Sequence, residues 1–196
     1  FTSLFEVFKM KEIYSKYENY IKWLQKGVSY QWDLNEESLQ KLELNFNKLP
    51  QYSKLLKPTH IVIHHAQIDS GNSDYYKFLH KGIFGWDDVG YHYIIGNGIA
   101  ELSIDGYIEE GRNIQFQGAH VKGHNSYTIG ICLTGNFDNY SPTENQIKSL
   151  TKLVTELMAK YDIPKENIVG HSDFEDVSKT CPGKLFNIDD YKKNYL

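Results

Sequence analysis

The segment GHSDFEDVSKTCPG, residues 170–183, places His171 and Cys181 in one predicted loop. Imidazole nitrogen and thiolate sulfur are both common zinc ligands, but a zinc site needs at least three protein ligands. A third ligand must therefore come from elsewhere, and the run HIVIHHA at residues 60–66 ends in a pair of histidines. The rest of the chain has to fold so that these two distant segments meet.

Three apolar runs in the second part of the chain predict strands. HIVIHHA and TIGICLTG (128–135) are rich in β-branched residues and have the continuous apolar character of buried strands. Residues 167–169 predict a last short strand that leads directly into His171. Runs at 90–96 and 107–112 are separated by Gly-Asn-Gly and Asp-Gly turn signals, which favour an antiparallel hairpin.

Two helices are predicted among these strands. Residues 74–81 suit a helix capped by Ser73 or Asp74. A longer helix starts at Ser141-Pro142-Thr143-Glu144, where the pattern predicts a serine cap, a proline in the first turn and a capping-box glutamate. Strands that alternate with helices, together with one hairpin, predict an α/β fold with a mixed central β-sheet flanked by helices.

Residues 1–57 have a different pattern and predict two helices. The first should end near Gly27, and the apolar residues of one face recur at three- and four-residue steps: Phe5, Phe8, Ile13, Tyr17, Tyr20, Ile21 and Leu24. The second should begin near Asp33, with Glu36 as its capping-box partner. It would turn three apolar side chains inward: Leu39, Leu42 and Phe46.

We therefore divide the chain into an N-terminal helical extension, residues 1–57, and a main domain, residues 58–196. The first interpretation of the extension is a helical pair packed on the main domain. The alternative is a module that binds a protein partner or a cell wall through its aromatic side chains: Tyr14, Tyr17, Trp23, Tyr30 and Trp32.

Charge and hydropathy exclude several classes of protein. The net charge of −4 argues against a nucleic-acid binder that depends on phosphate contacts. No apolar run approaches the roughly 20 residues that span a bilayer, so we expect no transmembrane segment. Charges and tyrosines interrupt the opening stretch, which is therefore not a signal peptide, although an export signal could have been removed. Cys132 lies within an apolar run and is interpreted as a small buried residue, not a disulfide partner.

The predicted ligand set has a chemical consequence. Two histidines and one cysteine leave the fourth position of a tetrahedral zinc ion open for water, as in catalytic zinc sites. Such a site suits hydrolysis, because zinc can acidify a water molecule and polarise the bond to be broken. A lone strand histidine is more often a packed core residue, so spacing alone leaves both interpretations open.

Four motifs in order make the zinc interpretation specific. They are IVIHH, GWDDVGYHYII, GAHVKGHNSYTIGICLTGNF and GHSDFEDVSKTCPG, and together they span roughly residues 58–186. This order and these gaps resemble the zinc N-acetylmuramoyl-L-alanine amidases of the phage-lysozyme and peptidoglycan-recognition-protein type. Residues 1–57 lie outside the resemblance.

The resemblance implies a role for several residues. His64, His171 and Cys181 would hold one zinc ion per chain, and His65 would point to the opposite face of its strand. Cysteine at the last position favours an enzyme, because recognition members of the family that only bind peptidoglycan typically lack it.

Four further residues have roles by the same resemblance. Tyr91 and Lys179 would be catalytic and would stabilise the oxyanion of the attacked carbonyl. His120 and Asn125 would contact the substrate. Some family members carry a glutamate as general base on the strand that matches TIGICLTG, whereas this chain has Cys132 and Thr134 there. The identity of the general base is therefore open.

The resemblance predicts a peptidoglycan hydrolase that cleaves the amide between N-acetylmuramic acid and L-alanine with zinc-activated water. Two alternatives stay open: a peptidoglycan-binding module without catalysis, and a zinc peptidase that cuts within the stem peptide. The expected place of action is the bacterial cell wall. A phage endolysin, a bacterial autolysin and an antibacterial effector all fit, and the lack of a visible signal peptide favours endolysin-like release.

Overall fold

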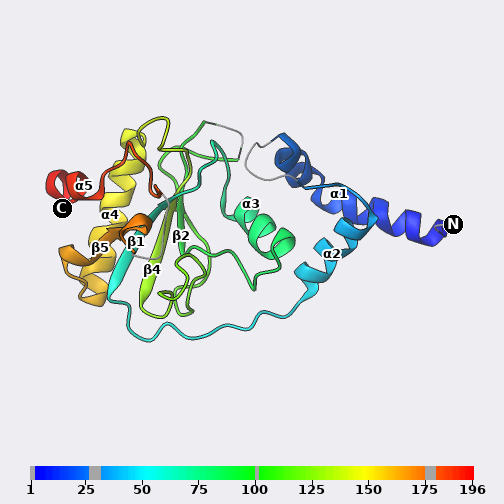
Figure 1. Ribbon diagram of the computed structural model, residues 1–196, viewed down its shortest axis with the longest axis horizontal. Coiled ribbons are helices and arrows are strands. Elements are labelled where there is room, and N and C mark those ends of the chain that lie inside the picture. Colours follow the sequence, from blue (N-terminus) through cyan, green and yellow to red (C-terminus); the bar gives the residue numbers. More distant parts are fainter. Residues whose placement is uncertain (1–2, 27–31, 100–101, 175–179) are drawn as a thin grey trace.

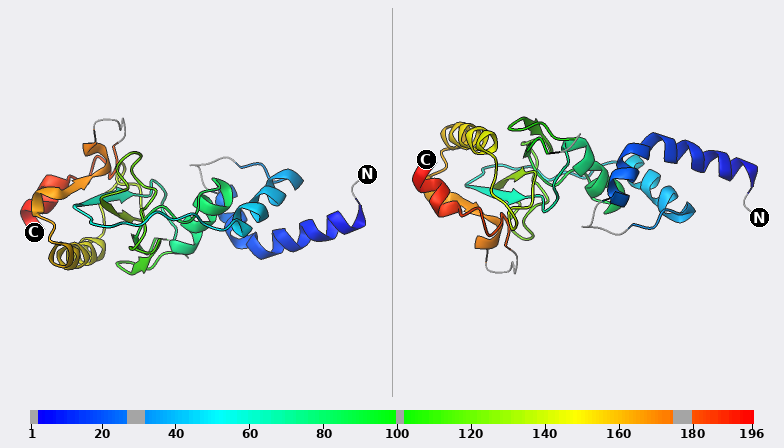
Figure 2. Two further views of the ribbon diagram at one scale, coloured as in Figure 1. Left: turned by 90° about the horizontal axis from the view of Figure 1, so that it is seen from below. Right: turned by 90° about the horizontal axis from the view of Figure 1, so that it is seen from above.

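The computed structural model describes residues 3–26, 32–99, 102–174 and 180–196. A central sheet lies between two groups of helices, and the N-terminal helices extend away from it at one end of the molecule (Figures 1 and 2). The C-terminus lies at the opposite end. None of the described helices is long and apolar enough to cross a membrane.

The sheet has five strands in the order β3-β2-β4-β1-β5. Only the β2–β3 pair is antiparallel among the described strands, whereas β1 pairs in parallel with β4 and β5, and β2 pairs in parallel with β4. The strands are β1 (His60–His65), β2 (Tyr93–Ile95), β3 (Ile108–Glu110), β4 (Thr128–Leu133) and β5 (Ile168–Gly170). The mixed sheet and its hairpin confirm the predicted fold class.

Helices α4 (Glu144–Tyr161) and α5 (Ile188–Tyr195) cover one face of the sheet. Ile61 and Ile63 of β1 point into this core, and His65 lies on the same side because strand side chains alternate. The backbone N–H of Phe137 donates to His65 Nδ1 at 3.0 Å. His65 therefore points away from the face that carries His64, as expected.

The start of α4 differs from the prediction. Thr143, not Ser141, is the N-cap, and its capping-box partner is Gln146, not Glu144. The side chain of Gln146 is fully buried, and its Nε2 atom donates to the backbone carbonyls of Ile95 and Thr134. These long-range hydrogen bonds, which the local pattern cannot show, fix where the helix begins.

The other face of the sheet is covered by α3 (Ser73–Lys77) and by the π-helical turn η1 (Phe78–Ile83) that continues it. The predicted helix over 74–81 is thus an α-helix that widens into a π-helix, and its N-cap is Asn72. Gly82 lies against α2 (Glu36–Asn47) so closely that an added Cβ would be 2.4 Å from Phe46 and 2.6 Å from Leu42. The absence of a side chain at Gly82 lets the two helical segments meet.

The N-terminal helices join this second core. Helix α1 (Leu4–Lys26) buries Ile13, Tyr17, Ile21 and Leu24 together with residues of α2, α3 and η1. The extension is therefore packed on the main domain, in agreement with the first interpretation. The division at residues 57 and 58 stays a prediction.

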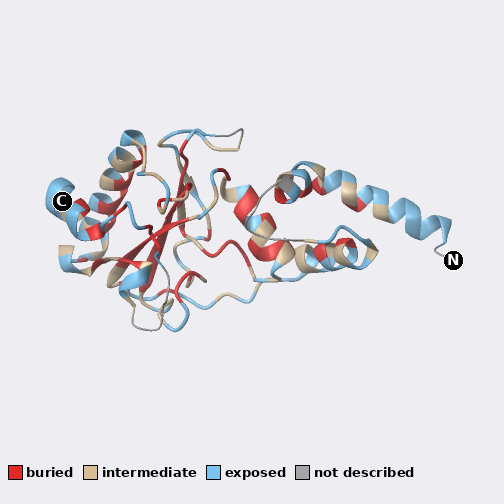
Figure 3. Cartoon of the chain, turned by 45° about the horizontal axis from the view of Figure 1, so that its top comes forward, coloured by how far each residue is buried: buried red, intermediate tan, exposed pale blue. Residues whose placement is uncertain are grey.

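Two local predictions in the extension were wrong, and two lie outside the described residues. Phe5 and Phe8 are 78% and 75% exposed, because the first turns of α1 project beyond α2 (Figure 3). Helix α2 is capped by Asn35 with Ser38 as its capping-box partner, not by Asp33 with Glu36. The predicted helix end at Gly27 and the side chain of Tyr30 lie outside the described residues.

The packing of α2 gives a first prediction. Leu42 is 1% exposed within the second core, so Leu42→Ala should lower the free energy of unfolding by about 2–5 kcal/mol through lost burial and a residual cavity. Urea denaturation followed by circular dichroism measures the change. Leu44 on the same helix is 71% exposed and is the matched control, for which Leu44→Ala should change stability by less than about 0.5 kcal/mol. Equal effects of the two substitutions would contradict the packing of the extension.

Candidate metal centre and active site

Three predicted ligands meet at the ends of two neighbouring strands. The ligand atoms of His64, His171 and Cys181 all lie within 4.8 Å of one another. Strands β1 and β5 are parallel, and Ile63 pairs with Gly170. His64 is the next residue of β1, and His171 directly follows the end of β5, so the register of the sheet itself brings them together.

The third donor, Cys181, lies on the C-terminal segment that begins at Thr180. Cys181 is 5% exposed, and its carbonyl accepts a 2.8 Å hydrogen bond from the backbone N–H of Ser172. Asp138 holds the residues on either side of Cys181. Its carboxylate accepts hydrogen bonds from the Thr180 hydroxyl at 2.9 Å and from the backbone N–H of Lys184 at 3.0 Å. These hydrogen bonds lower the pKa of Asp138 from its ordinary value. The thiol is thus positioned by bonds on both sides.

The donor set fits zinc. Cys181 Sγ lies 3.7 Å from His64 Nδ1. Two ligands bound at about 2.0 Å (nitrogen) and 2.3 Å (sulfur) in a tetrahedral arrangement would be roughly 3.5 Å apart. The separation of the two atoms therefore agrees with binding to one ion. No carboxylate belongs to this cluster among the described residues, so a zinc ion there would have one position open to a small ligand.

Tyr91 lies beside this cluster, where the resemblance places it. Its ring centroid is 5.2 Å from that of His64. Burial, together with the neighbouring Cys132 and Cys181, raises the pKa of Tyr91 well above its ordinary value. The phenol therefore stays protonated at neutral pH and can donate a hydrogen bond.

Cys132 lies on the same face as His64, because the two residues are register partners on the parallel strands β1 and β4. Cys132 is fully buried, and the two cysteines form no disulfide with each other. Burial raises the pKa of its thiol well above the ordinary value. The predicted burial of Cys132 is confirmed, and its side chain is a neutral thiol next to Tyr91.

The two residues predicted to touch substrate lie in one loop. The side-chain oxygen of Asn125 accepts from the backbone N–H groups of His120 (2.9 Å) and Val121 (3.0 Å). His120 is buried, and its Nδ1 lies 3.0 Å from His64 Nε2. Burial lowers the pKa of His120 well below its ordinary value. The sequence did not reveal this contact with His64. Lys179 lies outside the described residues.

Two other histidines, His80 and His92, form hydrogen bonds with backbone groups. The backbone N–H of Gly90 donates to His80 Nδ1 at 2.9 Å. His92 accepts from Gly130 N–H through Nδ1 and contacts the carbonyl of Phe116 through Nε2. Burial lowers the pKa of both His80 and His92 to about 4.

These pKa values predict an acid-sensitive fold. In the unfolded chain a histidine has a pKa of about 6.5, so the unfolded state binds more protons between pH 6.5 and pH 4. Stability should be full above pH 6.5 and should fall by several kcal/mol, roughly 2–3 for each histidine, as the pH approaches 4. Urea denaturation of chelator-treated protein at pH 7 and pH 4.5 measures the change, and NMR titration of the two rings identifies its source. Equal stability at the two pH values would contradict the assignment.

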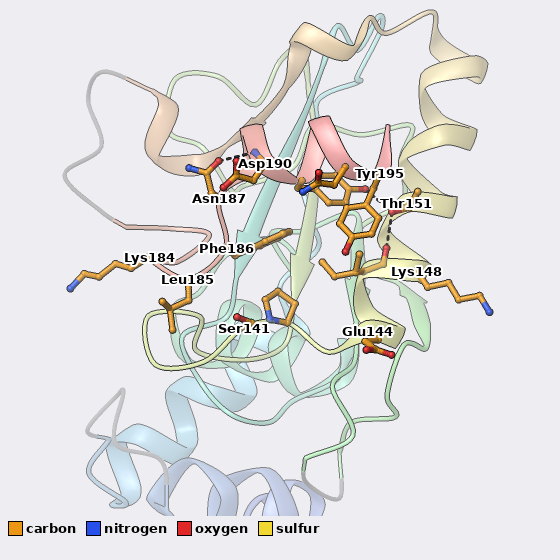
Figure 4. Close-up of a pocket in the computed structure, with 14 residues that line it drawn as sticks. Ser141, Glu144, Lys148, Thr151, Lys184, Leu185, Phe186, Asn187, Asp190 and Tyr195 are labelled. Atoms are coloured by element: carbon orange, nitrogen blue, oxygen red, sulfur yellow. Dashed lines mark hydrogen bonds between the residues drawn. The ribbon is translucent and has the colours of Figure 1, made fainter.

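A sizeable groove lies elsewhere, between α4 and α5 (Figure 4). It has a volume of about 820 Å³ and contains none of the three cluster residues. Ile147, Phe186 and Tyr191 belong to its walls, and all three pack in or against the core on the face of the sheet opposite to His64. The His64, His171 and Cys181 cluster therefore does not lie in this groove.

Comparison with known proteins adds to this geometry. The family described as N-acetylmuramoyl-L-alanine amidase matches residues 54–184. The endolysin of Enterobacteria phage K11 is 39% identical over 105 residues, which cover 50% of this chain and 61% of that protein. The human N-acetylmuramoyl-L-alanine amidase is 31% identical over 112 residues, which cover 56% of this chain and 18% of that protein. This chain thus matches less than two thirds of the length of these relatives.

A solved structure gives the same picture of the fold. The N-acetylmuramoyl-L-alanine amidase LysC from Clostridium intestinale URNW superposes with a TM-score of 0.62 and 30% identity. The alignment covers 74% of this chain and 95% of that one.

Proposed function

The chain belongs to the N-acetylmuramoyl-L-alanine amidase family, and on this premise we propose that it hydrolyses the amide between the lactyl group of N-acetylmuramic acid and L-alanine in peptidoglycan. The observation that carries the proposal is the meeting of His64, His171 and Cys181 at the ends of β1 and β5. We propose that these three residues hold one zinc ion per chain. Cys181 is the member of the set that favours catalysis over recognition alone.

We propose a separate role in the reaction for the metal, for Tyr91 and for Lys179. Bound zinc would supply a Lewis acid that acidifies water and polarises the scissile carbonyl. Tyr91, protonated beside the cluster, donates a hydrogen bond to the carbonyl oxygen as negative charge develops on it. Lys179 is proposed as a second group that stabilises this charge and, with Tyr91, as a source of the proton that the leaving alanine amine takes up.

The loop after β3 is proposed to contact the substrate. Asn125 uses its side-chain oxygen within the loop, so its NH₂ group is the part that we propose to meet the muropeptide. The resemblance implies the same role for His120, whose two ring nitrogens both lie beside protein atoms.

Two further proposals concern the helical extension and the place where the protein acts. We propose residues 1–57 as a helical extension and residues 58–196 as the amidase domain. The exposed apolar residues at the start of α1 leave a protein or wall partner of the extension as part of the proposal. The relatives named endolysin support action on the bacterial cell wall, reached by endolysin-like release or after loss of an export signal.

Mass analysis of digested sacculi tests the proposal directly. An amidase releases intact stem peptides with a new alanine amine and leaves glycan strands without peptides. A peptidase that cuts within the stem would produce a different new terminus, and a binding module would retain wall fragments without any new amine. Either of the last two results would replace the proposed function.

Metal removal gives a further prediction. Dialysis against a strong chelator should abolish release of the new amine, and one equivalent of zinc should restore it. The reason is that the zinc ion is the only Lewis acid in the proposed mechanism. A magnesium-treated sample is the control and should stay inactive, since imidazole and thiolate donors do not suit that ion. Full activity of metal-free protein would contradict the zinc assignment.

A further inference from the structure

The ring of His120 occupies a space that two glycines leave open. His120 is 8% exposed. A Cβ atom at Gly130 would lie 2.6 Å from its Cγ and Cδ2 atoms, and a Cβ atom at Gly118 would lie 2.5 Å from its Cδ2 atom. Gly130 lies inside the buried strand β4, and a glycine inside a strand often marks the close approach of another group. The fold thus reserves a tight place for this imidazole.

Both ring nitrogens of His120 face protein atoms. Nδ1 lies 3.0 Å from His64 Nε2, and Nε2 lies 3.4 Å from the hydroxyl of Thr128. The Thr128 hydroxyl donates its single hydrogen to the carbonyl of His124 at 2.9 Å. Towards His120 it can therefore only accept, so the hydrogen of a neutral His120 ring belongs on Nε2.

The position of the hydrogen on His120 also determines which nitrogen of His64 carries a hydrogen. With its hydrogen on Nε2, His120 presents a lone pair at Nδ1 and accepts a hydrogen bond from His64 Nε2–H. The lone pair of His64 is then on Nδ1, the atom that lies 3.7 Å from Cys181 Sγ. The hydrogen-bond chain and the metal cluster thus call for the same tautomer of His64.

We infer that His120 is a positioning residue that acts through His64: together with Thr128 it orients the imidazole and keeps Nδ1 available to the metal. The inference rests on the metal site of the proposed function. It replaces direct contact with substrate as the role of His120, because both of its ring nitrogens are already engaged. A partner of this kind commonly fixes the ring orientation of a metal-bound histidine.

The tautomers can be measured without any substitution. Long-range ¹H–¹⁵N NMR of the zinc-loaded protein distinguishes protonated, bare and metal-bound ring nitrogens. We expect His64 to bind through Nδ1 with a hydrogen on Nε2, and His120 to carry its hydrogen on Nε2. Binding of His64 through Nε2, or a hydrogen on His120 Nδ1, would overturn the inference.

Zinc affinity, measured by competition with a chromophoric chelator, gives a second readout. His120→Leu should weaken zinc binding by about 10- to 100-fold, the usual effect of losing an outer-shell partner. His120→Asn should recover most of the affinity, since its amide oxygen can take the place of Nδ1 as acceptor. Unchanged affinity in folded His120→Leu, judged by circular dichroism, would refute the positioning role.

Thr128 provides a smaller perturbation with a matched control. Thr128→Val removes the acceptor for His120 and should weaken zinc binding in the same direction as His120→Leu. Thr134 is equally buried near the end of the same strand, but its hydroxyl bonds to Tyr76 and Gly71. Thr134→Val should therefore leave zinc affinity at the wild-type value. Equal losses in the two variants would point to general destabilisation and against the inference.

These experiments separate the inference from the function on which it rests. Zinc affinity and tautomers do not depend on cleavage. If the wild-type protein binds zinc with the expected tautomers but releases no alanine amine, the positioning role stands and the amidase proposal fails. If it cleaves peptidoglycan but loses no zinc affinity in His120→Leu, the amidase proposal stands and the positioning role fails.

Discussion

Replacing Cys181 by alanine is expected to abolish peptidoglycan cleavage, with a loss of at least about a thousand-fold. In the proposed zinc site Cys181 would be the one negatively charged donor, and two neutral imidazoles alone would hold zinc weakly. The side chain is small and only 5% exposed, so the truncation leaves a small defect and a folded protein. Release of the alanine amine and zinc content by atomic absorption should fall together.

The other cysteine of the chain is the control for this experiment. Cys132 is also buried, and it lies on the neighbouring strand opposite His64 in the register, but it is not part of the ligand cluster. Cys132→Ala should therefore retain one zinc ion per chain. A Cys181→Ala protein that keeps both zinc and activity would remove the cysteine from the site. Loss of zinc in both variants would mean that burial, and not ligation, explains the result.

The meeting of the ligands was predictable because it depends on patterns that local sequence carries. Runs of β-branched residues predicted β1 and β4, and a short run before His171 predicted β5. Parallel strands in one sheet place their C-terminal ends at one edge, so a histidine at the end of each run lies near the other. Cys181 was predicted as the third ligand from its thiol and from the family resemblance, because spacing alone left the zinc interpretation open.

Two of the local errors share a physical cause, which is that the tertiary surroundings of a helix decide its ends and its buried length. Ser141 has a good capping sequence, yet the buried amide of Gln146 bonds to two distant carbonyls and places the start of α4 at Thr143. The apolar period of α1 correctly predicted a helix with a buried face. Periodicity does not say how far a partner extends, and Phe5 and Phe8 lie beyond α2.

The surroundings of the ligands were the least predictable part of the site. Whether His120 faces solvent or His64 depends on how its loop crosses β4, and no local pattern encodes that crossing. One signal was present in Gly130, a residue without a side chain in the middle of a buried strand. Lys179 lies outside the described residues, so its catalytic role stays a prediction.

Tyr91→Phe is expected to lower kcat by about 10²- to 10³-fold, the usual effect of removing one donor to an oxyanion. The substitution keeps the ring that packs beside His64 and removes only the hydroxyl. Zinc content and KM should therefore change little, since the hydrogen bond strengthens only as charge develops. Because burial raises the pKa of Tyr91 well above its ordinary value, the wild-type activity should not fall through this group anywhere near neutral pH.

A neighbouring tyrosine distinguishes catalysis from packing. Tyr76 is buried, its ring centroid is 6.4 Å from that of Tyr91, and its hydroxyl hydrogen-bonds to Thr134 at 2.9 Å. Tyr76→Phe removes an equivalent hydroxyl from the same surroundings, so its cost should appear in the free energy of unfolding and not in kcat. If both substitutions reduced kcat equally, the hydroxyl of Tyr91 would have no special relation to the scissile carbonyl. If Tyr91→Phe alone lost zinc, the residue would belong to metal binding and not to stabilisation of the oxyanion.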